Sequence, residues 1–94
     1  MKSKIEWVSR SDAGDRNTGQ LISIIVRHDD VGIEIFDPNH GVTWRGTLQR
    51  KGDQVAGRLK DSSGKYFADI DARLQPDSGN LKELGAKVGR TMTS

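Results

Sequence analysis

Six residues of this sequence could together bind an anion, namely Arg27, Arg45, Arg58, Lys60, Lys65 and Phe67. Each guanidinium group can donate paired hydrogen bonds to a carboxylate or a phosphate. An aromatic ring beside an arginine can hold the guanidinium group by stacking and can add apolar contact. If the fold brings these side chains to one surface, we expect that surface to bind an anionic macromolecule.

Four further residues could form a groove for a small ligand, namely His28, Gly46, Gly57 and Ala68. Three of them have small side chains or none, and a row of small residues leaves space above the backbone of a sheet. Such a groove can accept a ligand. It can also be filled by the protein itself, through Trp7 or the C-terminal segment, because protein interiors are close-packed.

The sequence offers little for catalysis or for metal binding. It has no cysteine and two histidines, His28 and His40, which the expected hairpin separates by roughly 20 Å. Asp69 and Asp71 share one face of a strand and could act as acid and base, although this spacing is also ordinary polar alternation. No serine has a histidine beside it in the expected layout. We therefore predict a non-catalytic protein with no metal and no cofactor.

The elements that must position these side chains are β-strands. Apolar and polar residues alternate in several short runs, and turn-forming residues separate the runs at regular intervals. This pattern predicts an all-β fold, an antiparallel meander of about six to seven strands curled as a small barrel or half-barrel. The expected strands cover residues 5–10, 21–28, 31–36, 41–50, 53–60 and 65–74.

Residues 1–94 fit a single β domain. Within it, the polar stretch 11–20 is expected to form a mobile loop. From residue 80 onward the pattern is ambiguous, because apolar residues between Leu81 and Val88 recur at both helical and strand spacing. The sequence therefore leaves a short helix and a final strand as alternatives.

The turns also predict how the strands pair. Short hairpin loops place four pairs of residues opposite each other, namely His28 with Val31, Phe36 with Gly41, Arg50 with Asp53 and Lys60 with Lys65. In this register Arg27, Arg45 and Arg58 form one row on the outer face, with Phe67 at its end. Trp44 is expected to be buried between Ile33 and Leu59. The inner face is then apolar, and consists of Ile22, Ile24, Val26, Val31, Ile33, Ile35, Val42, Trp44, Leu48, Val55, Leu59, Tyr66, Ala68, Ile70, Ala72 and Leu74.

Charge and composition limit the binding partners and the cellular location that we expect. Fifteen basic and thirteen acidic residues give a formal net charge of +2, which by itself favours no partner class. The absence of cysteine and of an apolar N-terminal run favours a cytoplasmic protein with no membrane partner. We expect a binding module for an acidic protein surface, with nucleic acid and a small ligand as alternatives. A homodimer through Ile25 or bare edge strands is a further expectation.

Overall fold

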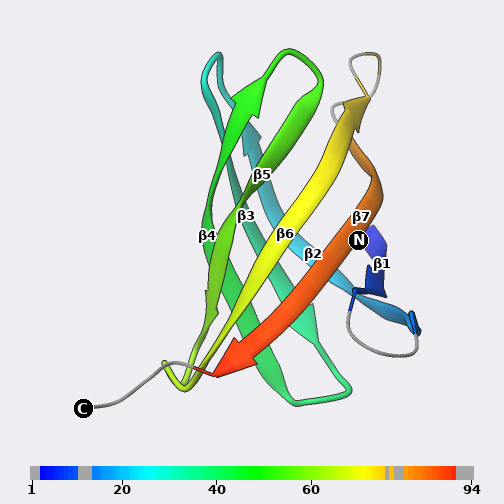
Figure 1. The fold of residues 1–94 in the computed structure, drawn as a ribbon, viewed down its shortest axis with the longest axis vertical. Helices are drawn as coiled ribbons and strands as arrows, with labels where there is room; N and C mark the ends of the chain where they lie inside the picture. The colour runs from blue at the N-terminus through cyan, green and yellow to red at the C-terminus, as the bar shows by residue number, and fades with distance from the viewer. Residues whose placement is uncertain (1–2, 11–13, 76, 78–79, 91–94) are drawn as a thin grey trace.

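Seven strands follow one another around a closed barrel in the computed structural model, which describes residues 3–10, 14–75, 77 and 80–90 (Figure 1). The strands are β1 (Ser3–Ser9), β2 (Arg16–Val26), β3 (Asp30–Asp37), β4 (Val42–Lys51), β5 (Gln54–Asp61), β6 (Tyr66–Gln75) and β7 (Asn80–Arg90). The predicted all-β meander is confirmed, and its sheet closes. In the part of the chain that the structure describes, no helix is long and apolar enough to cross a membrane.

Alternating burial is clearest in β3, where every second residue lies inside the barrel. The buried members are Val31, Ile33, Ile35 and Asp37. Successive side chains of a strand point to opposite faces, so the apolar members of this pattern supply one wall of the core. The last member is an aspartate, which indicates that the interior becomes polar where β3 ends.

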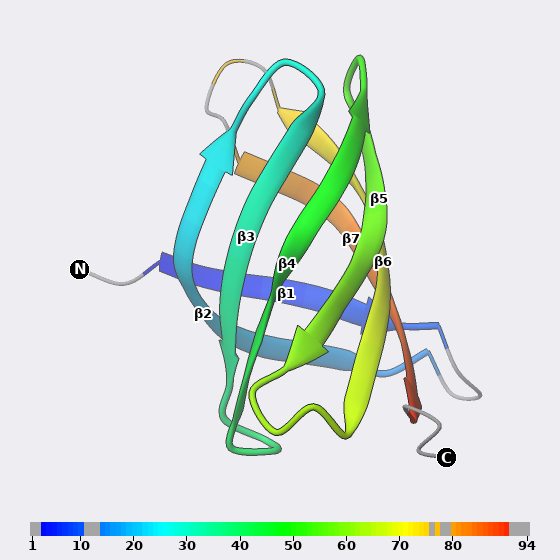
Figure 2. The same cartoon turned by 90° about the vertical axis from the view of Figure 1, so that its left-hand side faces the viewer.

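The odd number of strands decides how the barrel closes. Neighbouring strands run antiparallel, so the first and the seventh run in the same direction and pair in parallel. Among the described residues this seam has two register pairs, Val8 with Gly85 and Ser9 with Ala86. Figure 2 shows β1 running across the long axis of the barrel, whereas β3 and β4 run along it. The seam between β1 and β7 is therefore short.

Hydrogen bonds from Arg10 stabilise the pairing of β1 with β7. Its backbone N–H donates a hydrogen bond to the carbonyl of Ala86 at 2.8 Å, and its Nη2 donates to Oδ1 of Asp71 at 2.7 Å. The guanidinium group occupies the space that a Cβ atom at Gly85 would need. Glycine at this position is thus required for the arginine to lie across the seam.

The predicted inner face is largely confirmed. Val31 and Leu48 have no exposed surface, and most of the other predicted members are also buried. Ile22, Tyr66 and Val26 are exceptions, with 42%, 40% and 38% of their surface exposed. The register of β2 shifts between Leu21 and Ser23, so Leu21 packs against the core in place of Ile22. Val26 lies opposite the buried Val31 at the end of its strand.

The predicted register is wrong by two residues at each hairpin. Val31 pairs with Val26 instead of His28, and Asp37 pairs with Val42, where Phe36 was expected opposite Gly41. The other two hairpins are displaced in the same manner, with Lys51 opposite Gln54 and Lys60 opposite Phe67. Each displacement moves a strand by two residues relative to its neighbour. This preserves the face of every side chain but changes its neighbours.

Trp44 illustrates both outcomes. It is buried, as predicted, with 7% of its surface exposed. Its cross-strand neighbours are Ile35 and Asp61, whereas Ile33 and Leu59 were expected. The tryptophan therefore lies closer to the end of the barrel than predicted, beside a carboxylate.

The structure corrects the expected loop 11–20 in part, and it shows the strand alternative for the segment from residue 80. Part of the expected loop 11–20 is strand, because residues 16–20 begin β2 and pair with β1. Residues 11–13 of that loop lie outside the described part of the chain. The segment from residue 80 is strand β7 and not a helix, since it completes the sheet between β6 and β1.

Candidate functional site

The predicted row of three arginines does not form. Arg45 lies opposite Glu34 and Lys60, whereas Arg58 lies one step along the sheet, opposite Thr47 and Asp69. Arg27 lies outside β2, in the hairpin that leads to β3. The structure therefore places the three guanidinium groups in separate rows.

Each of these arginines also contacts a carboxylate of its own chain. Arg27 Nη1 lies 2.8 Å from Oδ1 of Asp30, and Arg45 Nη2 lies 3.2 Å from Oε2 of Glu34. Arg58 Nε lies 2.8 Å from Oδ1 of Asp69. The positive charge that was expected to attract an anion is thus largely compensated within the sheet.

The pair of Arg58 and Asp69 is tight enough to shift both groups. A hydrogen bond from Arg58 lowers the pKa of Asp69, and the same bond raises the pKa of Arg58. The guanidinium carbon lies 3.9 Å from the centroid of the Phe67 ring, which confirms the predicted stacking. Lys60 is opposite Phe67 and next to Arg45, whereas Lys65 lies in the β5–β6 hairpin. Phe67 is consequently occupied by intramolecular contacts.

The four residues of the predicted small-ligand groove do not lie together in the structure. His28 is exposed in the β2–β3 hairpin, far from the other three residues in the register. Side chains of the core lie over both glycines, because a Cβ at Gly46 would meet Cδ2 of Leu59 at 2.9 Å, and one at Gly57 would meet Leu48. The protein thus fills these positions itself. Ala68 lines a cavity to which His28, Gly46 and Gly57 do not contribute.

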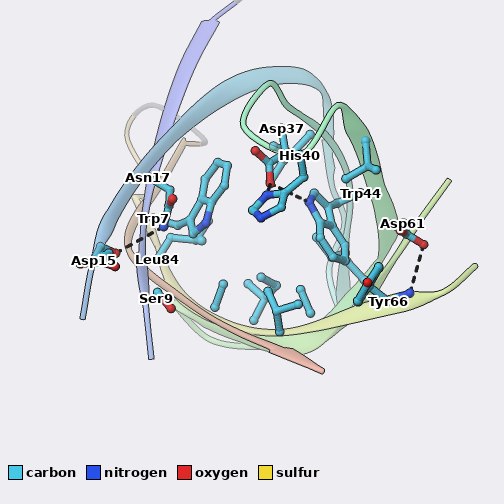
Figure 3. Close-up of a pocket in the computed structure, with 17 residues that line it drawn as sticks. Trp7, Ser9, Asp15, Asn17, Asp37, His40, Trp44, Asp61, Tyr66 and Leu84 are labelled. Atoms are coloured by element: carbon cyan, nitrogen blue, oxygen red, sulfur yellow. Dashed lines mark hydrogen bonds and ion pairs between the residues drawn. The ribbon is translucent and has the colours of Figure 1, made fainter. Parts of the chain in front are cut away.

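That cavity has a volume of about 650 Å³ and opens at the end of the barrel where the β3–β4 and β5–β6 hairpins lie (Figure 3). Its wall is mainly apolar and aromatic. The apolar members are Ile35, Val42, Leu59, Ala68, Ile70, Leu84, Ala86 and Val88, and the aromatic members are Trp7, Trp44 and Tyr66. The polar members are Ser9, Asp15, Asn17, Asp37, His40 and Asp61. We call this space the mouth cavity.

Asp37, at the end of β3, organises one side of the mouth cavity. Its side chain is 4% exposed. Oδ2 lies 2.8 Å from Nδ1 of His40 and accepts a hydrogen bond from Nε1 of Trp44 at 3.4 Å, while Oδ1 accepts from the backbone N–H of Asn39. The imidazole of His40 and the indole N–H of Trp44 therefore both lie against this carboxylate.

Asp61, at the end of β5, has a similar role on the neighbouring hairpin. Burial favours its protonated form, but hydrogen bonds from the Ser63 hydroxyl and from the backbone N–H groups of residues 64–66 outweigh burial and lower its pKa. The Ser63 bond is 2.8 Å long, and the bond from the N–H of Tyr66 is 3.3 Å. Asp61 is therefore a buried carboxylate that keeps its charge at neutral pH.

Trp7 lies on the opposite side of the mouth cavity from Trp44 (Figure 3). Its ring covers Gly19, where a Cβ would lie 2.8 Å from Cζ3 of the indole and 2.5 Å from the carbonyl oxygen of Phe36. Glycine at this position allows the indole to lie flat against β2. The predicted filling of a groove by Trp7 is thus replaced by a different arrangement, in which the ring forms part of the cavity wall.

The sequence analysis missed the polar residues of this cavity. The expected strands 31–36 and 53–60 end just before Asp37 and Asp61, and His40 precedes the expected strand 41–50, so all three were expected to lie in loops. A usable signal was present, since β3 and β5 run in the same direction and each ends in an aspartate that precedes a hairpin. Two such strands bring their final residues to one end of a meander.

Neither a metal site nor a known relative explains the cavity. Among the described residues no group of three or more His, Cys, Asp or Glu side chains is placed to hold a metal ion. Comparison with known proteins gives no match to any protein-family model, curated protein or solved structure.

Proposed function

We propose that this protein is a non-catalytic binding protein that holds a small, largely apolar molecule in the mouth cavity. The observation that supports this proposal is the cavity itself, a space of about 650 Å³ walled by apolar and aromatic side chains in a 94-residue chain. Small-molecule sites are concave, mostly apolar and of roughly 300–1,000 Å³. Protein interiors otherwise leave few voids larger than a water molecule.

The polar groups of the cavity suit an orienting role. Asp37 and Asp61 are buried at the ends of β3 and β5, on either side of β4, and both are fixed by hydrogen bonds. A ligand would bury its apolar part against Ile70 and Ala86 and meet polar groups at the rim. Sites of this kind gain affinity from the apolar wall and orientation from a few polar groups.

Binding of an anionic macromolecule through the outer face has less support. Arg27, Arg45 and Arg58 each have a carboxylate within 3.2 Å. A partner would have to replace these pairs and desolvate the arginines, which removes much of the gain. The expected homodimer has less support as well, because the strand edges that could have paired between two copies are paired within the closed barrel.

The test uses N-phenyl-1-naphthylamine, a neutral apolar dye whose emission rises when it leaves water. We expect the wild-type protein to bind the dye at one site per chain. Ala68→Leu, which extends a side chain into the mouth cavity, should weaken binding at least tenfold, with folding verified by circular dichroism. Ala86→Leu provides a second variant should the first fail to fold.

The matched control is the triple variant Arg27→Ala, Arg45→Ala and Arg58→Ala, which changes the outer face alone. It should bind the dye as the wild type does. If the wild-type protein does not bind the dye, or if the two leucine variants bind it undiminished, the mouth cavity is not a ligand site.

A further inference from the structure

We infer that the ligand of the mouth cavity is an organic cation, an apolar or aromatic body that carries an ammonium group. This inference rests on the proposed function and adds the chemical class of the ligand. It depends on three properties of the cavity wall, namely its charge, its aromatic rings and its balance of hydrogen-bond donors and acceptors.

The acidic side chains that line the cavity outnumber the basic ones. Three of the lining residues described above are aspartates, Asp15, Asp37 and Asp61, and none is a lysine or an arginine. Two of these carboxylates are buried, with 3% of Asp37 and 6% of Asp61 exposed. A concave, low-dielectric wall of one sign focuses its field and concentrates ligands of the opposite charge. The cavity therefore favours a cation and disfavours an anion.

The aromatic rings of the cavity come from three different strands. Trp7 lies on β1, Trp44 on β4 and Tyr66 on β6, and Figure 3 shows Trp7 on the opposite side of the cavity from Trp44 and Tyr66. The faces of indole and phenol rings attract cations, with tryptophan the strongest. Ammonium groups are commonly recognised by several such rings together.

The buried polar groups at the rim accept hydrogen bonds. Asp37 accepts from the backbone N–H of Asn39, and Asp61 accepts from the hydroxyl of Ser63. The indole N–H of Trp44 also points to Asp37 and is not available to a ligand. A ligand that donates hydrogen bonds or carries positive charge suits these carboxylates, whereas a ligand carboxylate or phosphate would meet groups of its own charge.

One cation of the chain already approaches the aromatic rim. The guanidinium carbon of Arg90 lies 6.0 Å from the centroid of the Tyr66 ring, although Arg90 does not line the cavity. Tyr66 thus shows the expected preference within the protein. A bound ammonium group would compete with Arg90 for this ring and would be repelled by its charge.

The experiment compares three ligands of one shape that differ in charge. They are 4-hydroxyphenyltrimethylammonium, the neutral 4-tert-butylphenol and the anionic 4-hydroxybenzenesulfonate. Each competes with N-phenyl-1-naphthylamine, and calorimetry measures the affinity directly. At pH 7 and low salt we expect the cation to bind at least tenfold more tightly than the neutral compound, and the anion to bind most weakly.

Variants then test whether the carboxylates that line the cavity cause the preference for a cation. Asp61→Asn and the more exposed Asp15→Asn should each lower the ratio of cation to neutral affinity severalfold, with the neutral affinity unchanged. Arg90→Gln should raise that ratio. The matched control is Asp30→Asn, which removes a carboxylate paired with Arg27 in the β2–β3 hairpin and should leave the ratio as in the wild type.

The outcomes separate the two proposals. Equal or better binding of the neutral compound overturns the inference about charge and leaves the proposed function intact. Absence of dye binding to the wild-type protein overturns the proposed function, and the inference with it. A cation preference that persists in Asp61→Asn and Asp15→Asn at wild-type strength also overturns the inference, because the preference then arises elsewhere.

Discussion

The two halves of the barrel interior are built from the same strands but are filled differently. In the half nearest the β2–β3 and β4–β5 hairpins, Val31, Leu48 and Val55 are at most 2% exposed and meet in the core. In the other half, side chains of the same inward rows surround the mouth cavity of about 650 Å³. Tight packing and open space are thus separated along the axis of the barrel. We call the packed half the closed half, and the half that surrounds the cavity the mouth half.

The largest expected effect comes from emptying the closed half. Leu48→Ala removes a fully buried side chain from a well-packed site, so it should lower the free energy of unfolding by about 2–5 kcal/mol. Val88→Ala, at the mouth, changes a side chain that is 50% exposed and should cost much less. Urea unfolding of both variants measures the difference, and equal losses would mean that the two halves contribute alike.

The second comparison enlarges a buried alanine in each half of the barrel. Ala72 and Ala68 are both buried alanines of β6, four residues apart, but only Ala68 lines the mouth cavity. Ala72→Leu should destabilise the protein by about 1–3 kcal/mol, because the closed half has no room for added methylene groups. Ala68→Leu should leave the free energy of unfolding nearly unchanged, since the added side chain enters open space. A loss at Ala68 as large as that at Ala72 would contradict the difference between the halves.

The smallest effect concerns pH and compares a carboxylate of the mouth with one of the outer face. The folded state lowers the pKa of Asp61 and of Asp69 below the ordinary value near 3.8. Each therefore adds stability above pH 3.8, and that stability is lost as the pH falls through the lowered pKa. Asp61→Asn and Asp69→Asn should each flatten the decline of stability between about pH 4 and 2.

The control for this prediction is Asp29→Asn, in the exposed β2–β3 hairpin, which should leave the acid profile as in the wild type. Denaturant unfolding at several pH values measures the profiles, and NMR titration of the carboxyl carbons measures each pKa directly. An Asp61 that titrates at or above 3.8 would show that burial outweighs its hydrogen bonds.

The sequence predicted which face each strand residue occupies, but not its neighbours. Faces depend only on alternation, and a register error of two residues leaves them unchanged. Neighbours depend on the exact position of each loop. Gly41 and Gly52 have φ values of 64° and 62°, and each lies inside its loop. Both loops have the expected length but begin one residue later in the chain, so Asp37 pairs with Val42 and Lys51 with Gln54. The arginine row failed for this reason.

The mouth cavity could not be predicted from the meander alone. Its wall depends on Trp7 of β1, a strand whose pairing was not predicted. It also depends on the hydrogen bonds that fix Asp37 and Asp61. Alternation predicts that residues point inward, but it does not predict whether they meet. That depends on the width of the barrel, and hence on whether the sheet closes with six strands or with seven.

The short parallel seam also has a consequence for the order of assembly. Every pairing from β1–β2 to β6–β7 joins consecutive strands, whereas β1 and β7 pair across almost the whole chain, Val8 with Gly85. Contacts between distant residues carry a larger entropic cost of loop closure, so we expect this seam to form last and to open first. Trp7 and Ser9 reach the cavity on β1, and the site is therefore complete only when the final strand has docked. A ligand bound between Trp7 and Trp44 would then hold the seam closed and slow amide hydrogen exchange in β1 and β7.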